Sequence, residues 1–422
     1  MELKEYKLGD LIEVTRGMSL PGEFYSTEGE YIRLTCGNFD YVNNSFKENK
    51  SKDDLYYVGK IKPEFIMEKG DIITPLTEQA IGLLGSTAII PESGKYIQSQ
   101  DVAKVTCKKG MIDHDFAYYL IPSKCVKEQL SAAAQQTKIR HTSPDAIKAC
   151  KVFVPPLSEQ KKIASVLSAL DDKIALNKKM NQKLEAMAKR LYDYWFVQYD
   201  FPDKNGHPYK TTGGKMVYND QLKREIPAGW EVKQICDIAK IFNGSTPSTT
   251  EEGNYGGEIV WITPKDLSDQ NCKFVYQGAR NITQAGYDSC STTMVPKGTV
   301  VMSSRAPIGL LSIAQCDLCT NQGFKNMVPN DMTDSKYLYY TIQQHIPQIQ
   351  NLGTGTTFKE VSKDELGRFA ILYPPKKLIA AFEEKVASIF DVQFNKVKEI
   401  TRLTALRDKL LPLLMNGQVT IK

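Results

Sequence analysis

The feature that most constrains the fold of this chain is a repeat of about half its length. The segment VPPLSEQKKIASVL, residues 154–167, has a counterpart in YPPKKLIAAFEEKV, residues 373–386. In both copies a short apolar run ends at two prolines, and a long helical pattern begins behind them. Pro374 corresponds to Pro155, so the offset in residue number is 374 − 155 = 219. Such a repeat constrains the whole architecture more than any single element does.

The correspondence continues upstream of the prolines at a slightly different offset. There the offset is 227 (237 − 10): Asp10-Leu11 matches Asp237-Ile238, Gly17 matches Gly244, and 81–84 matches 308–311. The second copy is therefore eight residues shorter between Leu84 and Pro155 (227 − 219 = 8), a difference that surface loops of one fold accommodate. The repeated unit is a whole domain followed by a helix.

Each copy begins with a mixed α+β domain. Short β-like runs such as 70–73 and 298–301 are bounded by Gly, Pro and Asn, and a serine before each last short helix can cap it. We expect domain one at 1–156, a long helix at 157–196, a connector of successive turns at 197–229, domain two at 230–375, and a second helix with a tail at 376–422.

The helical segments carry the spacing of a coiled coil. Between Ser158 and Trp195 there is neither Pro nor Gly, and seam positions recur in alternating steps of four and three from 163 to 195. The second helix, from about Lys377 to Leu411, follows this spacing less strictly. Each seam needs a partner, and the sibling helix is the nearest candidate.

Polar residues interrupt the seam near its middle. Asn177 and Asn181 occupy seam positions, where they either fix the register of the helices or face solvent as the seam drifts. The second helix breaks the spacing near Gln393 and Lys396. We therefore expect the middle of the helix pair to be polar or filled with water.

No motif in the sequence supports catalysis. Pro144-Asp145 followed by Glu159 and Lys161 fits the text of a nuclease motif, but Glu159 and Lys161 fall in the first turn of a helix rather than on one strand. The proline pairs lack the amide and the aromatic residue of an aminomethyltransferase motif. Four scattered histidines and a lone Cys316-x-x-Cys319 pair predict neither a triad nor a metal site. We expect a non-catalytic chain without a cofactor.

Composition and charge place few limits on the partner. A net charge of +5 neither establishes nor excludes nucleic-acid binding, because phosphate contacts come from local clusters of Lys and Arg. Nine cysteines are scattered through a chain whose first residues show no secretory signal, so we expect reduced thiols. The longest apolar stretches are too short to span a bilayer, and we expect a cytoplasmic protein.

Two related domains on one chain suit a target that has two parts. Symmetric DNA-binding proteins use identical subunits and bind palindromes, so two divergent copies predict an asymmetric target with two different half-sites. Loops rich in Thr, Ser, Gln, Lys and Arg are the candidate reading surfaces, with solvated loops as the alternative. The candidate DNA-binding residues are Arg16, Thr74, Thr77, Gln79, Thr137, Lys138 and Arg140 in the first copy, and Ser245, Thr246, Lys265, Ser303, Ser304, Arg305, Thr356, Thr357 and Lys359 in the second.

Five segments, in a fixed order on the repeat, carry a resemblance that covers essentially the whole chain. They are PPLSEQKKIASVLSALDDKI at 155–174, LYDYWFVQYDFP at 191–202, IPAGWEV at 226–232, GTTFKEVSKDEL at 355–366, and LRDKLLPLLMNGQV at 406–419. Together they resemble the specificity subunit of type I restriction-modification systems. Any one segment alone is a weak signal, and their combination is specific.

The resemblance implies two α/β target recognition domains, 1–156 and 230–375, separated by two long antiparallel helices that form a coiled-coil spacer with a pseudo-twofold relation. It implies that each domain reads one half of a split sequence in double-stranded DNA. Two modification subunits, which bind S-adenosylmethionine and methylate adenine, are expected to dock on the helices and domains, and restriction subunits with motor and nuclease activity join them. Candidates for helix packing or for this docking are Leu184, Leu191, Trp195, Phe196, Leu410 and Leu414.

Two other functions stay open at this point. A free-standing bipartite DNA-binding scaffold or regulator would need no methyltransferase partner. A nuclease would depend on Glu159 and a metal ion.

Overall fold

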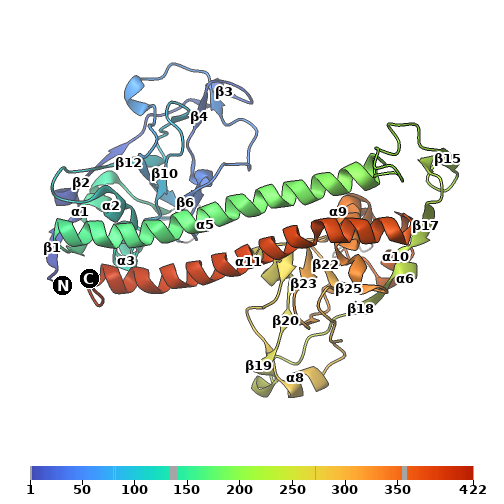
Figure 1. Cartoon of the computed structure of the whole chain (residues 1–422). Coiled ribbons are helices and arrows are strands. Elements are labelled where there is room, and N and C mark those ends of the chain that lie inside the picture. The colour runs from blue at the N-terminus through green and yellow to red at the C-terminus, as the bar shows by residue number, and fades with distance from the viewer. Residues whose placement is uncertain are drawn as a thin grey trace. The chain divides into compact units, whose positions relative to one another are not determined.

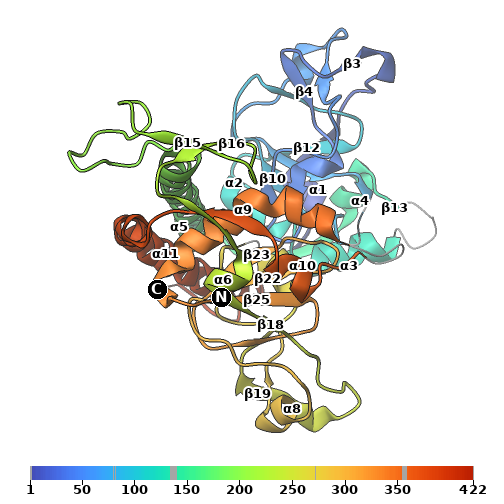
Figure 2. The same ribbon diagram turned by 90° about the vertical axis from the view of Figure 1, so that its right-hand side faces the viewer.

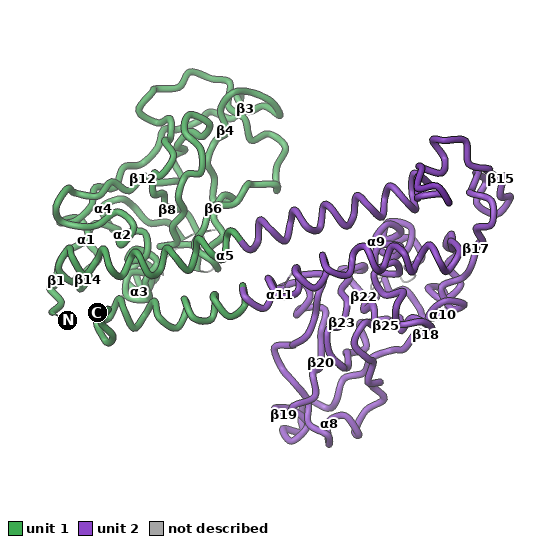
Figure 3. The backbone as a smooth tube through the Cα atoms, viewed as in Figure 1, with its two compact units in different colours: residues 1–176, 400–422 green, residues 177–399 purple. Residues whose placement is uncertain are grey.

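The computed structural model describes residues 2–78, 80, 82–133, 140–270, 272–353 and 359–421. The chain forms two compact units, shown in Figure 3. Unit 1 comprises Met1–Leu176 and Ile400–Lys422, and unit 2 comprises Asn177–Glu399. Each unit combines a globular α+β domain with parts of two long helices, α5 (Leu157–Tyr192) and α11 (Lys376–Met415). The predicted α+β class is confirmed.

Unit 1 is built on a four-stranded sheet. Its strand order is β10 (Ala88–Ile89), β8 (Ile72–Pro75), β12 (Val102–Cys107) and β2 (Ile12–Arg16). A second sheet has the order β11 (Tyr96–Ile97), β4 (Tyr31–Arg33), β7 (Tyr56–Tyr57) and β3 (Tyr25–Ser26). Two-stranded pairs join β1 (Lys4–Lys7) to β14 (Lys151–Val154), β9 (Thr77–Glu78) to β13 (Arg140–His141), and β5 (Phe39–Asp40) to β6 (Ser45–Phe46). The helices of this domain are α1 (Leu8–Leu11), α2 (His114–Leu120), α3 (Lys124–Ala133) and α4 (Pro144–Ala149).

Unit 2 repeats this plan with a five-stranded sheet. Its order is β18 (Ala239–Asn243), β25 (Phe324–Pro329), β22 (Val300–Ser303), β23 (Leu311–Ala314) and β21 (Phe274–Val275). Pairs join β17 (Glu231–Gln234) to β26 (Ala370–Tyr373), and β20 (Trp261–Ile262) to β24 (Cys319–Thr320), while β19 (Tyr255–Ile259) lies outside these sheets. The helices are α6 (Ile235–Ile238), α7 (Pro264–Gln270), α8 (Gln284–Asp288), α9 (Ser335–Leu352) and α10 (Lys363–Gly367).

The backbone pairing shows that the two domains are copies of one fold. Lys4 of β1 pairs with Val154 of β14, and Glu231 of β17 pairs with Tyr373 of β26. The residue numbers of these partners differ by 231 − 4 = 227 and by 373 − 154 = 219, the two offsets found in the sequence. Corresponding strands also follow in the same order in the two main sheets. The predicted repeat is therefore confirmed at the level of strand register.

The proline pairs mark the change from strand to helix in both copies. Strand β14 ends at Val154 and α5 begins at Leu157, while β26 ends at Tyr373 and α11 begins at Lys376. Proline has no N–H for a ladder and tolerates the start of a helix, so a pair of prolines ends the strand and permits the helix. The predicted junction is confirmed.

The two long helices pack against each other within each unit and run antiparallel (Figure 1). In unit 1, Ile163 and Leu167 near the start of α5 share a core with Leu414 near the end of α11. In unit 2, Tyr192 near the end of α5 packs with Phe382 near the start of α11. The ten predicted seam positions from 163 to 195 are all buried or half-buried, which confirms the coiled-coil seam.

The middle of the seam is polar, as predicted. Asn177 is fully buried, and Asn181 is half-buried and donates from Nδ2 to the backbone oxygen of Gln393 at 3.3 Å. Gln393 in turn donates from Nε2 to the backbone oxygen of Asn181 at 3.2 Å and to Oε2 of Glu185 at 3.2 Å. These contacts decide between the two interpretations of Asn177 and Asn181: both lie in the seam rather than in solvent.

A half-buried acid on α5 connects each globular domain to the helix pair. In unit 1, Tyr119 of α2 donates to Asp171 at 2.7 Å, and Asp171 pairs with Arg407 of α11 at 2.9 Å. In unit 2, Tyr340 of α9 donates to Glu185 at 3.1 Å, and Glu185 pairs with the buried ammonium group of Lys273. Burial lowers the pKa of Lys273 to about 8, although Glu185 opposes this shift.

The connector that follows α5 is ordered. Phe201 stacks on Tyr209, with ring centroids 4.6 Å apart, and on Trp230 at 5.4 Å. Strands β15 (Met216–Asn219) and β16 (Arg224–Pro227) form a hairpin. This hairpin projects away from the main sheet of unit 2 (Figure 1 and Figure 2). The predicted connector of turns thus contains a short antiparallel pair.

We predict that Asn177→Leu stabilises the protein. Neither polar atom of the Asn177 side chain has a hydrogen-bond partner among the described residues, and an unpaired buried amide opposes folding. The expected gain is about 1–2 kcal/mol in the free energy of unfolding, measured by urea denaturation. The control Lys178→Leu, on the exposed side of the same turn, should change stability by less than about 0.5 kcal/mol. A loss of stability in Asn177→Leu would contradict the prediction.

Candidate nucleic-acid interface

Four segments of unit 2 that are distant in the sequence meet at one place. The backbone N–H of Ser245 donates to the oxygen of Thr320 at 2.9 Å, and that of Ser304 donates to the oxygen of Gly323 at 2.8 Å. The N–H of Val361 donates to the oxygen of Ser304 at 3.0 Å. We call the segments 243–246, 304–306, 320–323 and 359–361 the loop junction of unit 2.

Unit 1 contains the corresponding loop junction, formed by segments 16–19, 76–78, 98–101 and 140–142. The N–H of Met18 donates to the oxygen of Gln98 at 3.3 Å, and that of Leu76 donates to the oxygen of Asp101 at 2.8 Å. The N–H of Thr142 donates to the oxygen of Leu76 at 2.9 Å. These three bonds join the same segments in the same order as those of unit 2, so the two copies assemble the junction through the same backbone contacts.

A glycine permits the closest approach in each junction. A Cβ atom placed on Gly17 would lie 2.3 Å from the backbone oxygen of Ser99, and one placed on Gly244 would lie 2.1 Å from that of Asn321. Real Cβ atoms do not come so near a backbone oxygen, so a side chain would separate the two segments. The matched glycines noted in the sequence are thus explained by this contact.

In each copy an ion pair links the second segment to the fourth. The acid is on the second segment in unit 1 and on the fourth segment in unit 2. In unit 1, Glu78 of the second segment pairs with Arg140 of the fourth at 3.4 Å. In unit 2, Arg305 of the second segment pairs with Glu360 of the fourth at 2.9 Å. The residues of each pair are also cross-strand partners. The backbone bonds align Arg305 with Thr77 and Glu360 with His141, so each copy links the two segments by an ion pair at a different position.

Unit 2 adds a buried cation to its pair. The ammonium group of Lys325 lies 3.1 Å from Glu360, and its side chain is 6 % exposed. Burial works to raise the pKa of Glu360, but hydrogen bonds from Arg305 and Lys325 lower it below its usual value. Glu360 therefore stays ionised at neutral pH and neutralises two cations at the junction.

The predicted DNA-binding residues fall into four groups by exposure. Exposed are Arg16, Lys265, Arg305 and Lys359. Half-buried are Arg140, Ser245 and Thr246. Buried are Thr74, Thr77, Ser303 and Ser304. Outside the described residues are Gln79, Thr137, Lys138, Thr356 and Thr357.

The buried hydroxyl residues hold the loops together instead of facing outward. Thr74 donates to the backbone oxygen of Ser86 at 2.8 Å, and Thr77 donates to Asp101 at 3.2 Å. Ser303 donates to the oxygen of Pro307 at 2.6 Å, and Ser304 lies 3.4 Å from the ammonium group of Lys325. Their side chains offer no surface to DNA in this structure, so we leave all four out of the interface.

The exposed cations lie in or beside the junctions. Arg16 donates from Nε to the backbone oxygen of Gln100 at 2.9 Å, which joins the first and third segments of unit 1. In unit 2, Pro264 lies against the third segment, since a Cβ placed on Gly323 would lie 3.1 Å from its Cγ. Lys265 therefore stands next to the junction that contains Arg305 and Lys359. In each copy, the two loops that were predicted to read DNA therefore meet at the same junction.

Sequence reasoning missed two exposed glutamines in the third segments. Gln100 and Gln322 are exposed and occupy equivalent positions, at an offset of 322 − 100 = 222. Thr246 donates a hydrogen bond to Oε1 of Gln322. The runs QSQD at 98–101 and TNQG at 320–323 align only at this third offset, and neither of the offsets 219 and 227 brings them together.

The predicted docking residues are mostly part of the helix packing. Trp195, Phe196 and Leu414 are buried, and Leu184, Leu191 and Leu410 are half-buried. Among them Trp195 and Phe196 contact the ring of Phe382. A different apolar set faces outward at intervals of seven residues: Met180, Met187 and Tyr194 are 37, 58 and 36 % exposed. We call these three residues the outer strip.

The nuclease interpretation has no geometric support. Asp145 lies in α4, whereas Glu159 and Lys161 lie in the first turns of α5. Glu159 pairs with Lys162 of the same helix at 2.9 Å. Within the described ranges, no cluster of three or more His, Cys, Asp or Glu residues could hold a metal ion. The prediction that these are charges at a helix start is confirmed.

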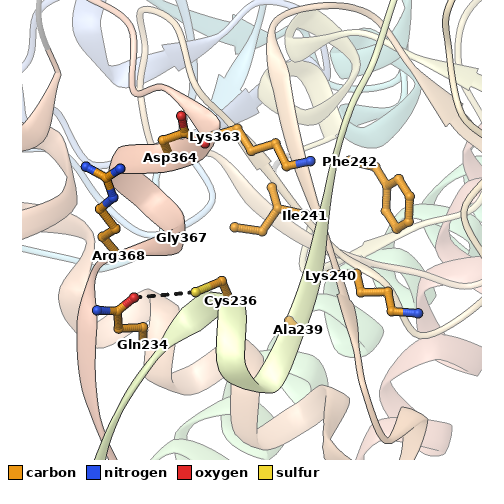
Figure 4. Close-up of a pocket in the computed structure, with 10 residues that line it drawn as sticks. All are labelled: Gln234, Cys236, Ala239, Lys240, Ile241, Phe242, Lys363, Asp364, Gly367 and Arg368. Atoms are coloured by element: carbon orange, nitrogen blue, oxygen red, sulfur yellow. Dashed lines mark hydrogen bonds between the residues drawn. The ribbon is translucent and has the colours of Figure 1, made fainter.

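A hollow of about 480 Å³ lies between α6 and α10 of unit 2 (Figure 4). Gly367 faces Cys236 there, and a Cβ placed on Gly367 would lie 3.5 Å from the Cβ of Cys236. In unit 1 the equivalent place is covered by Lys148, whose Cβ would lie 2.9 Å from one placed on Gly9. The glycine lies on α1 in unit 1 and on α10 in unit 2, so a lysine side chain covers this place in unit 1 and a glycine leaves it open in unit 2. We assign the hollow no ligand.

A family model confirms what the fold and the junctions indicate. Residues 1–186 and 227–405 match the type I restriction modification DNA specificity domain. These two matches cover most of the chain and fall one on each copy of the repeat. The chain belongs to this family.

Curated relatives and a solved structure agree. The chain is 25 % identical over 469 residues to the type I restriction enzyme HindI specificity subunit of Haemophilus influenzae, with 99 % of both chains covered. It is 39 % identical over 181 residues to the MjaIX specificity subunit of Methanocaldococcus jannaschii, covering 42 % of this chain and 41 % of that one. Its fold is similar to that of the type I restriction-modification S subunit from M. genitalium, with a TM-score of 0.62, 16 % identity, and 98 and 96 % coverage.

None of the helices in the described part of the chain is both long and apolar enough to span a bilayer.

We predict that Glu360→Ala destabilises the protein much more than Arg305→Ala. Removing Glu360 leaves the buried Lys325 without its carboxylate and should cost about 3 kcal/mol, whereas Arg305 forms an exposed pair worth less than about 1 kcal/mol. Urea denaturation of both variants measures the difference.

Glu360→Ala should also change how the stability of the protein depends on pH. Because the pKa of Glu360 is lowered in the folded chain, its stabilising contribution is present above the usual pKa of 4.5 and is lost as the pH falls through the folded value. Glu360→Ala should therefore lose less stability than the unmodified chain on acidification. Equal losses in Glu360→Ala and Arg305→Ala at neutral pH would contradict the assigned role of Lys325.

Proposed function

We propose that this chain is the DNA sequence-recognition subunit of a type I restriction-modification complex, and that its two loop junctions each read one half of an asymmetric bipartite target. The observation that carries the proposal is that one backbone arrangement is built twice with different side chains. The same bonds place both junctions, whereas Arg16, Ser99 and Asp101 of the first copy correspond to Asn243, Asn321 and Gly323 of the second. Two junctions with the same backbone but different side chains suit two half-sites of different sequence.

The cations of the junctions, all exposed except the half-buried Arg140, support DNA as the ligand. Arg16 and Arg140 in unit 1, and Lys265, Arg305 and Lys359 in unit 2, can contact phosphates and so position the neighbouring amide and hydroxyl groups over base edges. The candidates outside the described residues belong to the same loops in the sequence and stay part of the proposed interface: Gln79, Thr137, Lys138, Thr356 and Thr357.

We assign the parts of the chain as follows: target recognition domains at 1–156 and 230–375, helices at 157–196 and 376–422 that set the spacing between half-sites, and a connector at 197–229. Modification subunits, which carry the adenine methyltransferase activity, dock on the helices, and restriction subunits join them in the full complex. The chain itself is non-catalytic, and it acts in the cytoplasm with its DNA.

The outer strip is the surface that we propose for docking of a modification subunit. Leu184 and Leu191 are half-buried seam residues of the same unit and can extend this contact. Leu410 is half-buried in unit 1, and Trp195, Phe196 and Leu414 are engaged in helix packing. Exposed apolar side chains in a line along one helix face favour a helical partner. The free-standing regulator has no comparable support, because the named relatives are specificity subunits of restriction enzymes.

Exchange of one recognition domain should change one half of the target. Residues 230–375 are replaced by the corresponding domain of a relative with a different target, and methylated positions are sequenced in cells that carry the complex. We expect one new half-site and one unchanged half-site. Exchange of residues 1–156 is the matched control and should alter the other half. New sequences in both halves after a single exchange would contradict the modular assignment.

Charge on the outer strip should release the modification subunit. Met180→Glu combined with Met187→Glu places two carboxylates on a surface that the partner must desolvate, so we expect loss of co-purification with the modification subunit. Met111→Glu, at an exposed methionine of unit 1 outside the outer strip, serves as the control. Retained co-purification in the double variant would contradict docking on this strip.

A further inference from the structure

We propose that Gln100 and Gln322 are base-reading residues that occupy the same place in the two junctions, and that each recognises an adenine edge in its half-site. This inference rests on the proposed function and names the contact that gives it sequence specificity. It depends on the position, exposure, chemistry and surroundings of the two side chains.

The position of the two glutamines is fixed by the backbone of each junction. Gln100 lies between Gln98, whose oxygen accepts from Met18, and Asp101, whose oxygen accepts from Leu76. Gln322 lies between Thr320 and Gly323, whose oxygens accept from Ser245 and Ser304. Each glutamine is therefore held by its neighbours on both sides, and its side chain is exposed.

Gln100 and Gln322 are the same residue type, although the residues that flank them differ. The residues at either side of the glutamine are Ser99 and Asp101 in unit 1 and Asn321 and Gly323 in unit 2. An exposed side chain contributes little to stability, so folding alone does not require glutamine at both positions. A shared task in binding explains the identity better than a shared task in packing.

Separate contacts prepare the two glutamines for binding. In unit 1, Arg16 holds the backbone oxygen of Gln100 at 2.9 Å, which leaves the side-chain amide projecting from a fixed loop. In unit 2, the hydroxyl of Thr246 donates to Oε1 of Gln322 and orients the amide itself. Fixing a side chain before binding reduces the entropy lost on contact with the ligand.

The chemistry of the amide points to a base rather than to a phosphate. A primary amide carries no charge, but it offers a donor and an acceptor side by side, which match N7 and the N6 amino group of adenine in the major groove. The phosphate contacts are supplied by nearby cations: Arg16 and Arg140 in unit 1, and Arg305 and Lys359 in unit 2. Thr246 is a positioning residue for Gln322, because it acts through that side chain.

The test uses the chain in complex with its modification subunits and a library of duplexes with randomised sequence. Bound duplexes are selected and sequenced for the unmodified complex and for variants Gln100→Ala, Gln322→Ala and Gln322→Glu. We expect Gln322→Ala to relax one position of one half-site by about tenfold or more, and Gln100→Ala to do the same in the other half. Gln322→Glu should shift the preference at that position from adenine to cytosine, because a carboxylate accepts from the cytosine amino group.

Two controls separate the possible outcomes. Gln284→Ala changes an exposed glutamine of α8, outside the junction, and should leave both half-sites unchanged. Thr246→Val should weaken discrimination at the Gln322 position while leaving the other half intact. Unchanged profiles for Gln100→Ala and Gln322→Ala would overturn this inference while the two-part target stands. If the unmodified complex selects no two-part target, the proposed function fails and this inference fails with it.

Discussion

The rest of each unit depends on the burial of one helix of the globular domain against the long helices. In unit 2 this helix is α9, whose Tyr337 and Tyr340 pack on Tyr192 of α5 and whose Thr341 lies 3.0 Å from the hydroxyl of Tyr192. The aromatic core excludes water, so the pair of Glu185 and Lys273 beside it is more rigid than a surface pair would be. The main sheet also packs on α9, through β22 and β23, and the sheet carries the junction. The helix pair therefore positions the reading loops through its contact with α9 and through the sheet that packs on α9.

The sequence was informative about elements that repeat or that obey a strict period. The seam of α5 and the change from strand to helix at each proline pair follow from residue spacing alone, and both are present. The two offsets of the repeat also relate the register of β1 on β14 to that of β17 on β26, although the pairing itself comes from the structure. Asn177 and Asn181 show the limit of this reasoning, because a period locates the seam but does not say whether its polar positions stay buried.

The candidate site was predicted less well, for a physical reason. A serine or threonine in a loop has the same composition whether it faces DNA or bonds a backbone oxygen, and Thr74 and Ser303 do the latter. Their roles depend on which segment lies across from them, and that partner is distant in the sequence. Gln100 and Gln322 escaped notice because the loop before them changes length between the copies, so their relation appears only when the strands are superposed.

The three hydrogen bonds that assemble each junction run from backbone to backbone, and this has a consequence for how the protein can change over time. Since these bonds use only the backbone, substitutions at exposed positions of the reading loops leave the frame intact, whereas the buried hydroxyl residues and the glycine at the closest contact are constrained. Glu78 with Arg140 in unit 1 and Arg305 with Glu360 in unit 2 link the second and fourth segments at different positions, so the copies differ in their side-chain links while the backbone bonds are the same. A lineage can therefore acquire new target sequences by drift in a few exposed positions, and the cell gains a different methylation pattern while inheriting an unaltered scaffold.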